Sequence, residues 1–122
     1  MILIQPFSYK DPLKGWPYYG QLICELNKRG IEPTVIGSEQ EMFLELDGEY
    51  IDKRGKLCIV ELFELVRNAD KIICNESAIG HIAVCLGKSA IVLINRETPI
   101  RVIRNENTNL WRPTLREVLE RL

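Results

Sequence analysis

Residues 69–95, which decide the fold, read ADKIICNESAIGHIAVCLGKSAIVLIN. The apolar run at Lys71–Cys74 predicts a buried strand, and Asn75–His81 predicts a polar loop that opens a helix. Gly87 ends that helix, because glycine adopts the left-handed backbone conformation of a helix stop without steric strain. Ala90–Ile94 predicts a second buried strand, so the stretch is a βαβ unit.

Strands and helices also alternate along the rest of the chain. Strands are predicted in four further places: Met1–Gln5, Pro33–Ile36, Tyr50–Ile51 and Ile100–Arg104. Helices are predicted at Tyr18–Arg29, Ser38–Leu46, Leu57–Asn68 and from Pro113 to Leu122. Gly30 ends the first of these helices, and Ser38 with Glu41 has the spacing of a capping box at the start of the second.

The core strands are apolar on successive residues and not on alternate ones. Such strands are covered on both faces, which predicts a parallel sheet between layers of helices, joined by right-handed crossovers. We therefore expect an α/β fold: one Rossmann-like domain over residues 1–122, with a parallel sheet of about five strands.

Composition excludes several classes of protein. The 122 residues include 16 basic and 17 acidic ones, a net charge of −1, and the basic residues are scattered, so we expect no nucleic-acid partner. The apolar run Met1–Ile4 is too short for a signal peptide or a membrane span, so we expect a cytoplasmic protein with no membrane partner. Four cysteines lack metal-ligand spacing and are interpreted as buried thiols, with no metal or cofactor: Cys24, Cys58, Cys74 and Cys85.

The loop between the first strand and the helix of the βαβ unit is the candidate site. In an open parallel sheet, ligands lie outside the carboxyl ends of the strands, and the amide groups at the next helix N-terminus favour an anion. The loop and first helical turn offer four polar residues there: Asn75, Glu76, Ser77 and His81. This pattern indicates a site for a phosphorylated ligand.

Three segments also carry a family resemblance. They are Lys14–Pro17, Val35–Glu39, and Asn75–Ala83 followed by Leu86–Lys88. In order and spacing they resemble the motifs of the ADP-heptose:lipopolysaccharide heptosyltransferases, glycosyltransferase family 9. The resemblance covers nearly the whole chain but only the donor-nucleotide-binding half of that two-lobed GT-B fold. The family's N-terminal half, which supplies the acceptor surface and the catalytic carboxylate, has no counterpart here.

The resemblance implies binding roles for individual residues. It implies that Ser8 and Lys14 lie near the diphosphate and that Glu39 faces the nucleoside. It implies that four residues border the ribose and phosphates: Glu76, Ser77, Ala78 and His81. It implies no catalytic residue in this chain, because the family's catalytic carboxylate belongs to the other lobe.

These residues also have plainer interpretations. Asn75 would order the loop, Glu39 would complement a helix dipole, and Trp16 would be a core residue that anchors its loop against the first helix. His81, the only histidine, would be a partly buried helix residue. Three arginines after the last core strand would either reach phosphates or stay in solvent: Arg96, Arg101 and Arg104.

Three functions follow from this. The first is a stand-alone binding protein for a nucleotide diphosphate derivative, such as an ADP-sugar or an ADP-ribose-like ligand, that sequesters or senses it without catalysis. A homodimer joined through the apolar residues of the last helix would cover the open site. The second is a donor-binding subunit or remnant that works with a separate acceptor lobe. The third is a structural domain that has lost the site, because Glu76-Ser77-Ala78 replaces the family's Asp-Thr/Ser-Gly.

Overall fold

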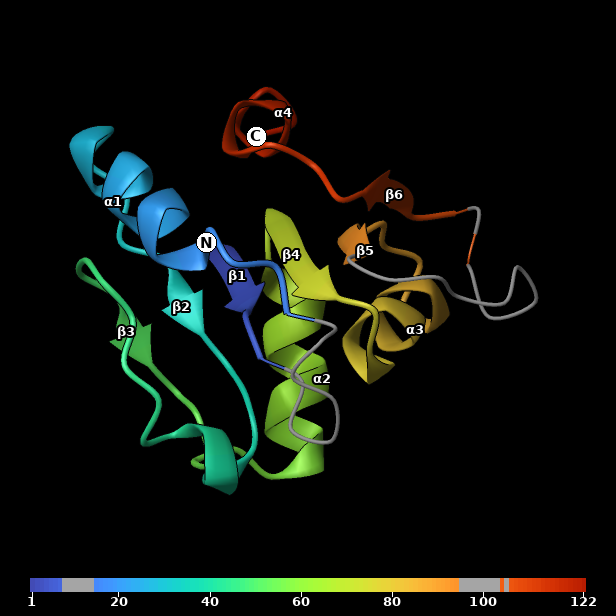
Figure 1. The fold of residues 1–122 in the computed structure, drawn as a ribbon. Helices are drawn as coiled ribbons and strands as arrows, with labels where there is room; N and C mark the ends of the chain where they lie inside the picture. The colour runs from blue at the N-terminus through green and yellow to red at the C-terminus, as the bar shows by residue number, and fades with distance from the viewer. Residues whose placement is uncertain (8–14, 95–103, 105) are drawn as a thin grey trace.

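The structure, a computed structural model, describes residues 1–7, 15–94, 104 and 106–122. Within these residues, six strands pair in the order β3-β2-β1-β4-β5-β6, and every pair is parallel (Figure 1). The strands are β1 (Ile2–Gln5), β2 (Thr34–Val35), β3 (Ile51–Asp52), β4 (Lys71–Asn75), β5 (Ile91–Ile94) and β6 (Thr108–Trp111). The α/β class and the parallel sheet are confirmed, with six described strands in place of about five.

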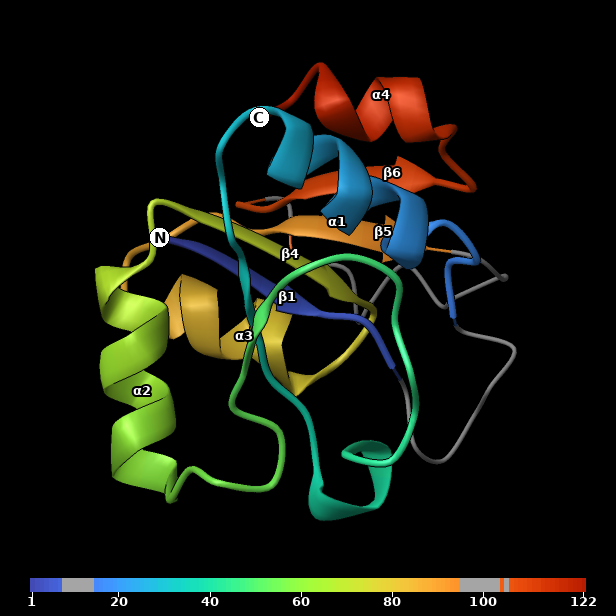
Figure 2. The same ribbon diagram turned by 90° about the vertical axis from the view of Figure 1, so that its left-hand side faces the viewer.

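Helices cover both faces of the sheet (Figure 2). One face carries α1 (Tyr19–Lys28) and α4 (Leu115–Leu119), and the other carries α2 (Ile59–Asn68) and α3 (Ala78–Cys85). Each face has its own apolar cluster, to which successive strand residues contribute in turn. In β1, Leu3 belongs to the cluster with α2 and α3, and Ile4 to the cluster with α1 and α4. Burial on both faces explains the continuous apolar runs in β4 and β5.

Two glycine helix stops form as predicted. Gly30 and Gly87 have φ angles of 78° and 72°. Behind them, the amide of Ile31 donates to the Leu26 carbonyl at 2.9 Å, and that of Lys88 to the Ala83 carbonyl at 2.8 Å. These bonds use carbonyls that have lost their partners at the helix ends, which fixes where α1 and α3 stop.

The C-terminal part of the chain differs from the prediction. The expected edge strand at Ile100–Arg104 lies outside the described residues except for Arg104, which is not in a strand. The edge strand that does form is β6, whose mixed sequence Thr-Asn-Leu-Trp lacks an apolar run. Pro113 precedes the helix, and Thr114 caps it by accepting from the Glu117 amide at 3.2 Å.

The apolar side chains of α4 are used inside the fold. Val118 is fully buried in the cluster shared with α1, and three leucines pack against that cluster: Leu115, Leu119 and Leu122. Val118 therefore has no exposed area for a dimer contact, whereas the three leucines are half-buried, and the homodimer through this helix stays a prediction.

The prediction of a helix at Ser38–Leu46 is also wrong. Only a short 3-10 turn forms, η2 (Glu39–Glu41), and the chain then runs irregularly to β3. The Glu41 carboxylate accepts from the Ser38 amide at 2.7 Å, so one half of the predicted capping box is present. The Ser38 hydroxyl is buried and has no hydrogen-bond partner in the described part of the chain.

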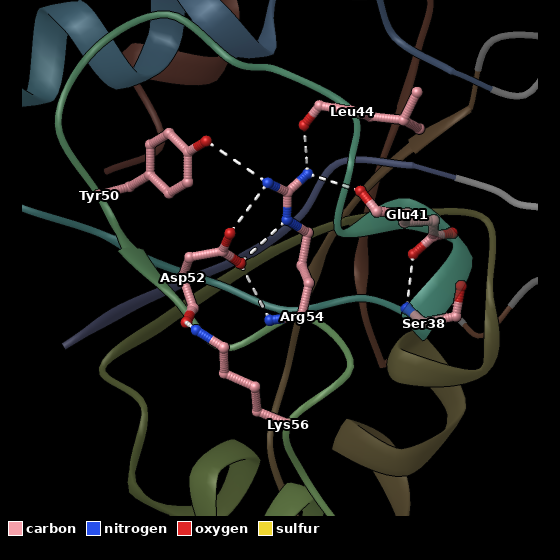
Figure 3. Close-up of polar contacts among 7 residues, drawn as sticks. All are labelled: Ser38, Glu41, Leu44, Tyr50, Asp52, Arg54 and Lys56. Carbon is pink, nitrogen blue, oxygen red and sulfur yellow. Dashed lines mark hydrogen bonds and ion pairs between the residues drawn. The ribbon is translucent and has the colours of Figure 1, made fainter.

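A buried arginine explains this irregular path (Figure 3). Arg54 is 2% exposed, and its Nη1 donates to the carbonyls of Glu41 at 2.8 Å and Leu44 at 2.6 Å. Its Nε and Nη2 each donate to the Asp52 carboxylate at 3.0 Å, and Nη2 also donates to the Tyr50 hydroxyl at 3.4 Å. The Glu41 carbonyl also accepts from the Leu44 amide at 3.1 Å, a bond three residues on where an α-helix would have one four residues on, so the guanidinium holds a tight turn at this point.

Arg54→Lys tests this anchor. One ammonium cannot reach Asp52 and two carbonyls in the geometry of the guanidinium fork, so the variant should lose about 3 kcal/mol of unfolding free energy. Urea denaturation of both proteins measures the difference. The matched control is Arg67→Lys, because Arg67 is exposed on α2 in a surface pair with Glu64, and it should change stability by less than about 0.5 kcal/mol. Equal stabilities of the two variants would contradict the anchor.

Asp52 makes part of this stability depend on pH. The Arg54 hydrogen bonds hold the pKa of the Asp52 carboxyl below its usual range. A lowered folded-state pKa adds stability above the unfolded pKa of about 4, and that stability is lost as pH falls through the folded value. Asp52→Asn should therefore be about 2 kcal/mol less stable than the parent at pH 7, with the gap closing below about pH 4. A gap that is constant from pH 7 to pH 3 in urea melts would rule this out.

Candidate functional site

The carboxyl ends of the central strands bring the predicted site residues together. β4 ends at Asn75, and α3 begins three residues later at Ala78 (Figure 1). Ser77 is the residue before α3, and its hydroxyl donates to the Gln5 side chain at the end of β1, with the oxygens 2.6 Å apart. This bond joins the start of α3 to the neighbouring strand, so the amides of the first helical turn are held at the edge of the sheet.

Asn75 fixes the carboxyl end of β4 through buried hydrogen bonds. It is fully buried, its Oδ1 accepts from the Tyr19 hydroxyl at 2.9 Å, and its Nδ2 donates to the Pro6 carbonyl at 2.8 Å. Burial raises the pKa of Tyr19 well above its usual value, so the phenol stays protonated and donates. Both ends of the Asn75 amide are thus engaged within the fold, as the plainer interpretation of this residue expects.

His81 lies in the first turns of α3 with an exposed side chain. Its Nδ1 accepts a hydrogen bond from Nε of Arg104, 3.1 Å away. Because an accepting nitrogen carries no proton, the neutral ring in this arrangement has its proton on Nε2. The pair therefore presents one ring N–H donor and one guanidinium charge beside the helix start.

A small cavity opens next to this pair. It has a volume of about 20 Å³, room for about one water, and its lining includes Glu76, Ser77, His81 and Arg104. Val92 and Ile94 add an apolar wall, and the His81 imidazole lines the cavity. A ligand larger than water would lie over this spot on the surface.

The backbone under the cavity is tightly packed, in a way that the sequence analysis did not anticipate. A Cβ on Gly80 would come within 3.3 Å of the Val92 side chain and 3.4 Å of Asn107 Nδ2. Asn107 is 8% exposed, donates to the Gly80 carbonyl at 3.1 Å and accepts from the Ala90 amide at 2.8 Å. Gly80 and Asn107 therefore seat α3 against β5, and no motif in the sequence pointed to Asn107.

The remaining predicted residues lie elsewhere or outside the description. Ala78 is the exposed first residue of α3, beside the cavity residues. Glu39 is exposed in η2 after β2, and it lines neither this cavity nor the larger one below. Ser8 and Lys14 lie outside the described residues, as do Arg96 and Arg101.

A larger cavity lies at the end of β1, between the start of α1 and the irregular chain after η2. Its volume is about 710 Å³. Trp16, predicted as a core residue, is 3% exposed and forms part of the wall, with its indole N–H donating to the Pro113 carbonyl at 2.8 Å. The wall comes from three separate segments, so no single motif signalled this cavity.

Other features bear on metals, thiols and membranes. The described residues contain no group of three or more His, Cys, Asp or Glu side chains able to hold a metal ion.

Cys74 is buried, and burial raises the pKa of its thiol to about 12, so it is no nucleophile. Cys58 and Cys85 are exposed and Cys24 is half-buried, so the expectation of buried thiols is wrong for these three. No helix in the described ranges is long and apolar enough to cross a membrane.

Three solved structures are similar to the chain. The glycosyl transferase family 9 from Veillonella parvula has 16% identity and a TM-score of 0.78, over 98% of this chain and 36% of its own. The E. coli ADP-heptose lipopolysaccharide heptosyltransferase II has 19% identity and a TM-score of 0.82, over 98% of this chain and 44% of its own. The dodecameric iron-containing glycosyltransferase TibC of enterotoxigenic E. coli has 20% identity and a TM-score of 0.63, over 76% of this chain and 26% of its own. TibC has also been solved with ADP-D-β-D-heptose.

The chain spans less than half the length of each of these proteins. At such identities the likeness shows the fold, which is that of one lobe of a GT-B glycosyltransferase. No curated protein matches the sequence. The family model for glycosyltransferase family 9 (heptosyltransferase) matches residues 1–113, nearly the whole chain. The chain therefore belongs to glycosyltransferase family 9.

Proposed function

We propose that the chain binds a nucleotide diphosphate derivative, such as an ADP-sugar or an ADP-ribose-like molecule, and captures it without transferring the sugar. The observation that carries the proposal is the His81–Arg104 pair beside the first turn of α3. Helix N-terminal amides, a ring N–H donor and a guanidinium are three kinds of group that bind phosphate oxygens. The amides and the ring belong to α3, and the guanidinium belongs to the segment between β5 and β6. A diphosphate would therefore bridge α3 and that segment.

Glu76 suits a different part of the same ligand. A carboxylate repels phosphate but accepts hydrogen bonds from the 2′ and 3′ hydroxyls of a ribose. Glu76 stands one residue before Ser77, at the rim of the small cavity. We infer that the ribose faces Glu76 and the phosphates face His81, which sets the direction of the ligand along the edge of the sheet.

The relatives support the class of ligand. One structural neighbour is an ADP-heptose heptosyltransferase, and another has been solved with ADP-D-β-D-heptose. Adenosine diphosphate joined to a sugar is therefore the first ligand to test. Transfer of a sugar also needs a base near an acceptor hydroxyl, and we assign no described residue of this chain to that role.

Family membership favours a second candidate. The chain matches less than half of its structural neighbours, whose further residues have no counterpart in the described fold. A separate polypeptide would then contribute the acceptor lobe, and this chain would act as the donor-binding part of a two-component glycosyltransferase.

Calorimetry with ADP tests the binding function. The chain should bind ADP or an ADP-sugar with micromolar affinity or better, and His81→Ala and Arg104→Gln should each weaken binding about tenfold or more, because each removes a polar contact to phosphate. Arg116→Gln is the control, since Arg116 is exposed on α4 and pairs with Glu120. Native mass spectrometry of protein purified from cells would identify a retained nucleotide by its mass. No heat with ADP, ADP-ribose or ADP-sugars would remove the proposal.

Activity assays separate the two candidates. The purified chain with ADP-glucose or ADP-heptose should release no more ADP than buffer does. If the second candidate holds, co-expression with a neighbouring gene product that carries an acceptor lobe should yield transfer, and His81→Ala should reduce it. Sugar transfer by the purified chain alone would contradict both assignments.

A further inference from the structure

The segment that leads into β6 contributes three polar side chains to the small cavity beside His81. Arg104 and Asn107 precede the strand, and Asn109 lies within it. Neither asparagine belongs to a sequence motif. Their hydrogen bonds lead to the backbone of Arg104 and to the residue before His81, so the two amides act on the pair that carries the proposed function.

Asn109 lies on the face of the sheet that α3 covers. It stands opposite Val92 in the parallel register of β5 and β6, and Val92 belongs to the apolar cluster with α2 and α3. The next residue, Leu110, packs against the cluster on the other face, as the alternation of side chains along a strand requires. An asparagine on a covered face is costly unless its amide is hydrogen-bonded, so its partners decide whether the position is tolerated.

The Asn109 amide nitrogen donates twice to the backbone beside the cavity. Nδ2 lies 2.9 Å from the Arg104 carbonyl oxygen and 3.3 Å from that of Asn107. The Arg104 carbonyl also accepts from the Asn107 amide at 3.1 Å, so two donors fix the backbone of Arg104. Because both protons of Nδ2 go to carbonyls, the Asn109 side chain has no N–H left for a phosphate.

Asn107 fixes the backbone on the other side of the contact. Its side chain donates to the carbonyl of Gly80, the residue before His81, at 3.1 Å, and it accepts from the Ala90 amide at 2.8 Å. The chain is thus held both next to His81 and at Arg104. The two side chains meet from these anchored positions, with Arg104 Nε 3.1 Å from His81 Nδ1.

This contact determines where the imidazole carries its proton. A guanidinium stays protonated in proteins, so its Nε only donates. A ring nitrogen that faces such a donor holds no proton of its own, and the neutral ring then has its proton on Nε2. Without a fixed donor, the two neutral forms of an imidazole exchange, and only one of them presents an N–H at Nε2.

We propose that Asn109 is a positioning residue, which holds Arg104 so that the guanidinium fixes His81 as the Nε2–H tautomer that donates to the diphosphate. The assignment rests on the proposed function. Asn109 acts on the ligand through Arg104 and His81, and it does not contact the phosphates. A polar residue at this place in β6 is therefore a requirement of the site.

The single histidine makes the tautomer directly measurable. In long-range ¹H–¹⁵N spectra at about pH 8.5, above the usual titration range of imidazole, a fixed tautomer separates the two ring nitrogen shifts widely, and exchange between tautomers draws them together. The separation should be large in the parent and smaller in Asn109→Ala. It should also shrink in Arg104→Lys, because lysine keeps the charge but has a methylene group where arginine has Nε.

Asn27→Ala is the matched control. Asn27 is also half-buried, and its Nδ2 also donates to two carbonyls, those of Ile31 at 3.0 Å and Glu49 at 2.9 Å. It belongs to α1, on the opposite face of the sheet from α3 (Figure 2), so its loss should leave the ring signals as in the parent. Asn109→Asp keeps the size of the side chain without its N–H donors, and it replaces Asn109→Ala if the alanine variant does not fold.

Two results of these spectra would overturn the inference. One is a parent ring that already exchanges between tautomers. The other is a folded Asn109 variant whose two ring shifts stay as far apart as in the parent, because the amide would then have no effect on the His81–Arg104 contact.

Calorimetry with ADP adds a readout of binding. Asn109→Ala should weaken ADP about threefold, less than the loss expected for His81→Ala, because it removes hydrogen bonds behind the contact and none to the ligand. An unchanged affinity in a variant whose ring signals have moved would contradict the inference. A parent that fixes the tautomer but binds no ADP would remove the proposed function and keep the positioning of His81. ADP binding by a parent with exchanging tautomers would do the reverse.

Discussion

The hydrogen bonds of Asn75 connect three segments at the carboxyl ends of the central parallel strands, where both cavities lie. One buried amide connects the end of β4 with the chain after β1, through the Pro6 carbonyl, and with α1, through the Tyr19 hydroxyl. A buried amide left without partners is costly, so the three segments are fixed relative to one another once this group is satisfied. Asn75 thereby keeps the residues that line the two cavities in a constant relation.

The connection from β2 to β3 follows a different principle. It contains one short 3-10 turn, and the guanidinium of Arg54 adds bonds to two of its backbone carbonyls. Arg54 satisfies backbone carbonyls and a carboxylate at the same time, which a lysine or a neutral side chain does not do. One buried cation thereby gives a loop without secondary structure a defined shape, and that shape forms a wall of the large cavity.

The sequence was sufficient where a signal is local. The continuous apolar runs of β4 and β5, the helical period of α1 and α2, and the stops at Gly30 and Gly87 all depend on neighbouring residues. The helix expected at Ser38–Leu46 does not form, and two carbonyls of this segment bond to Arg54, a long-range partner that local sequence does not indicate. β6 was missed because an edge strand with polar residues has no distinctive pattern.

In the candidate site too, the sequence indicated residues that are neighbours in the chain and missed contacts between separate segments. Asn75, Glu76, Ser77 and His81 could be proposed from the sequence because strand, loop and helix start follow one another there. The partnership of His81 with Arg104, the seating of α3 by Asn107, and the large cavity all join residues from separate segments. Propensity and spacing carry no information about such contacts, so they become visible only in the folded chain.

The pairing of β1 with β4 also governs how the chain reaches this state. Ile2 stands opposite Lys71, so the central pair of the sheet joins strands that lie about seventy residues apart in the chain. During synthesis, β1, α1 and β2 emerge before β4, so the side of β1 that pairs with β4 stays open until β4 follows. Contacts this distant in sequence slow folding, and an open strand edge favours aggregation during that interval.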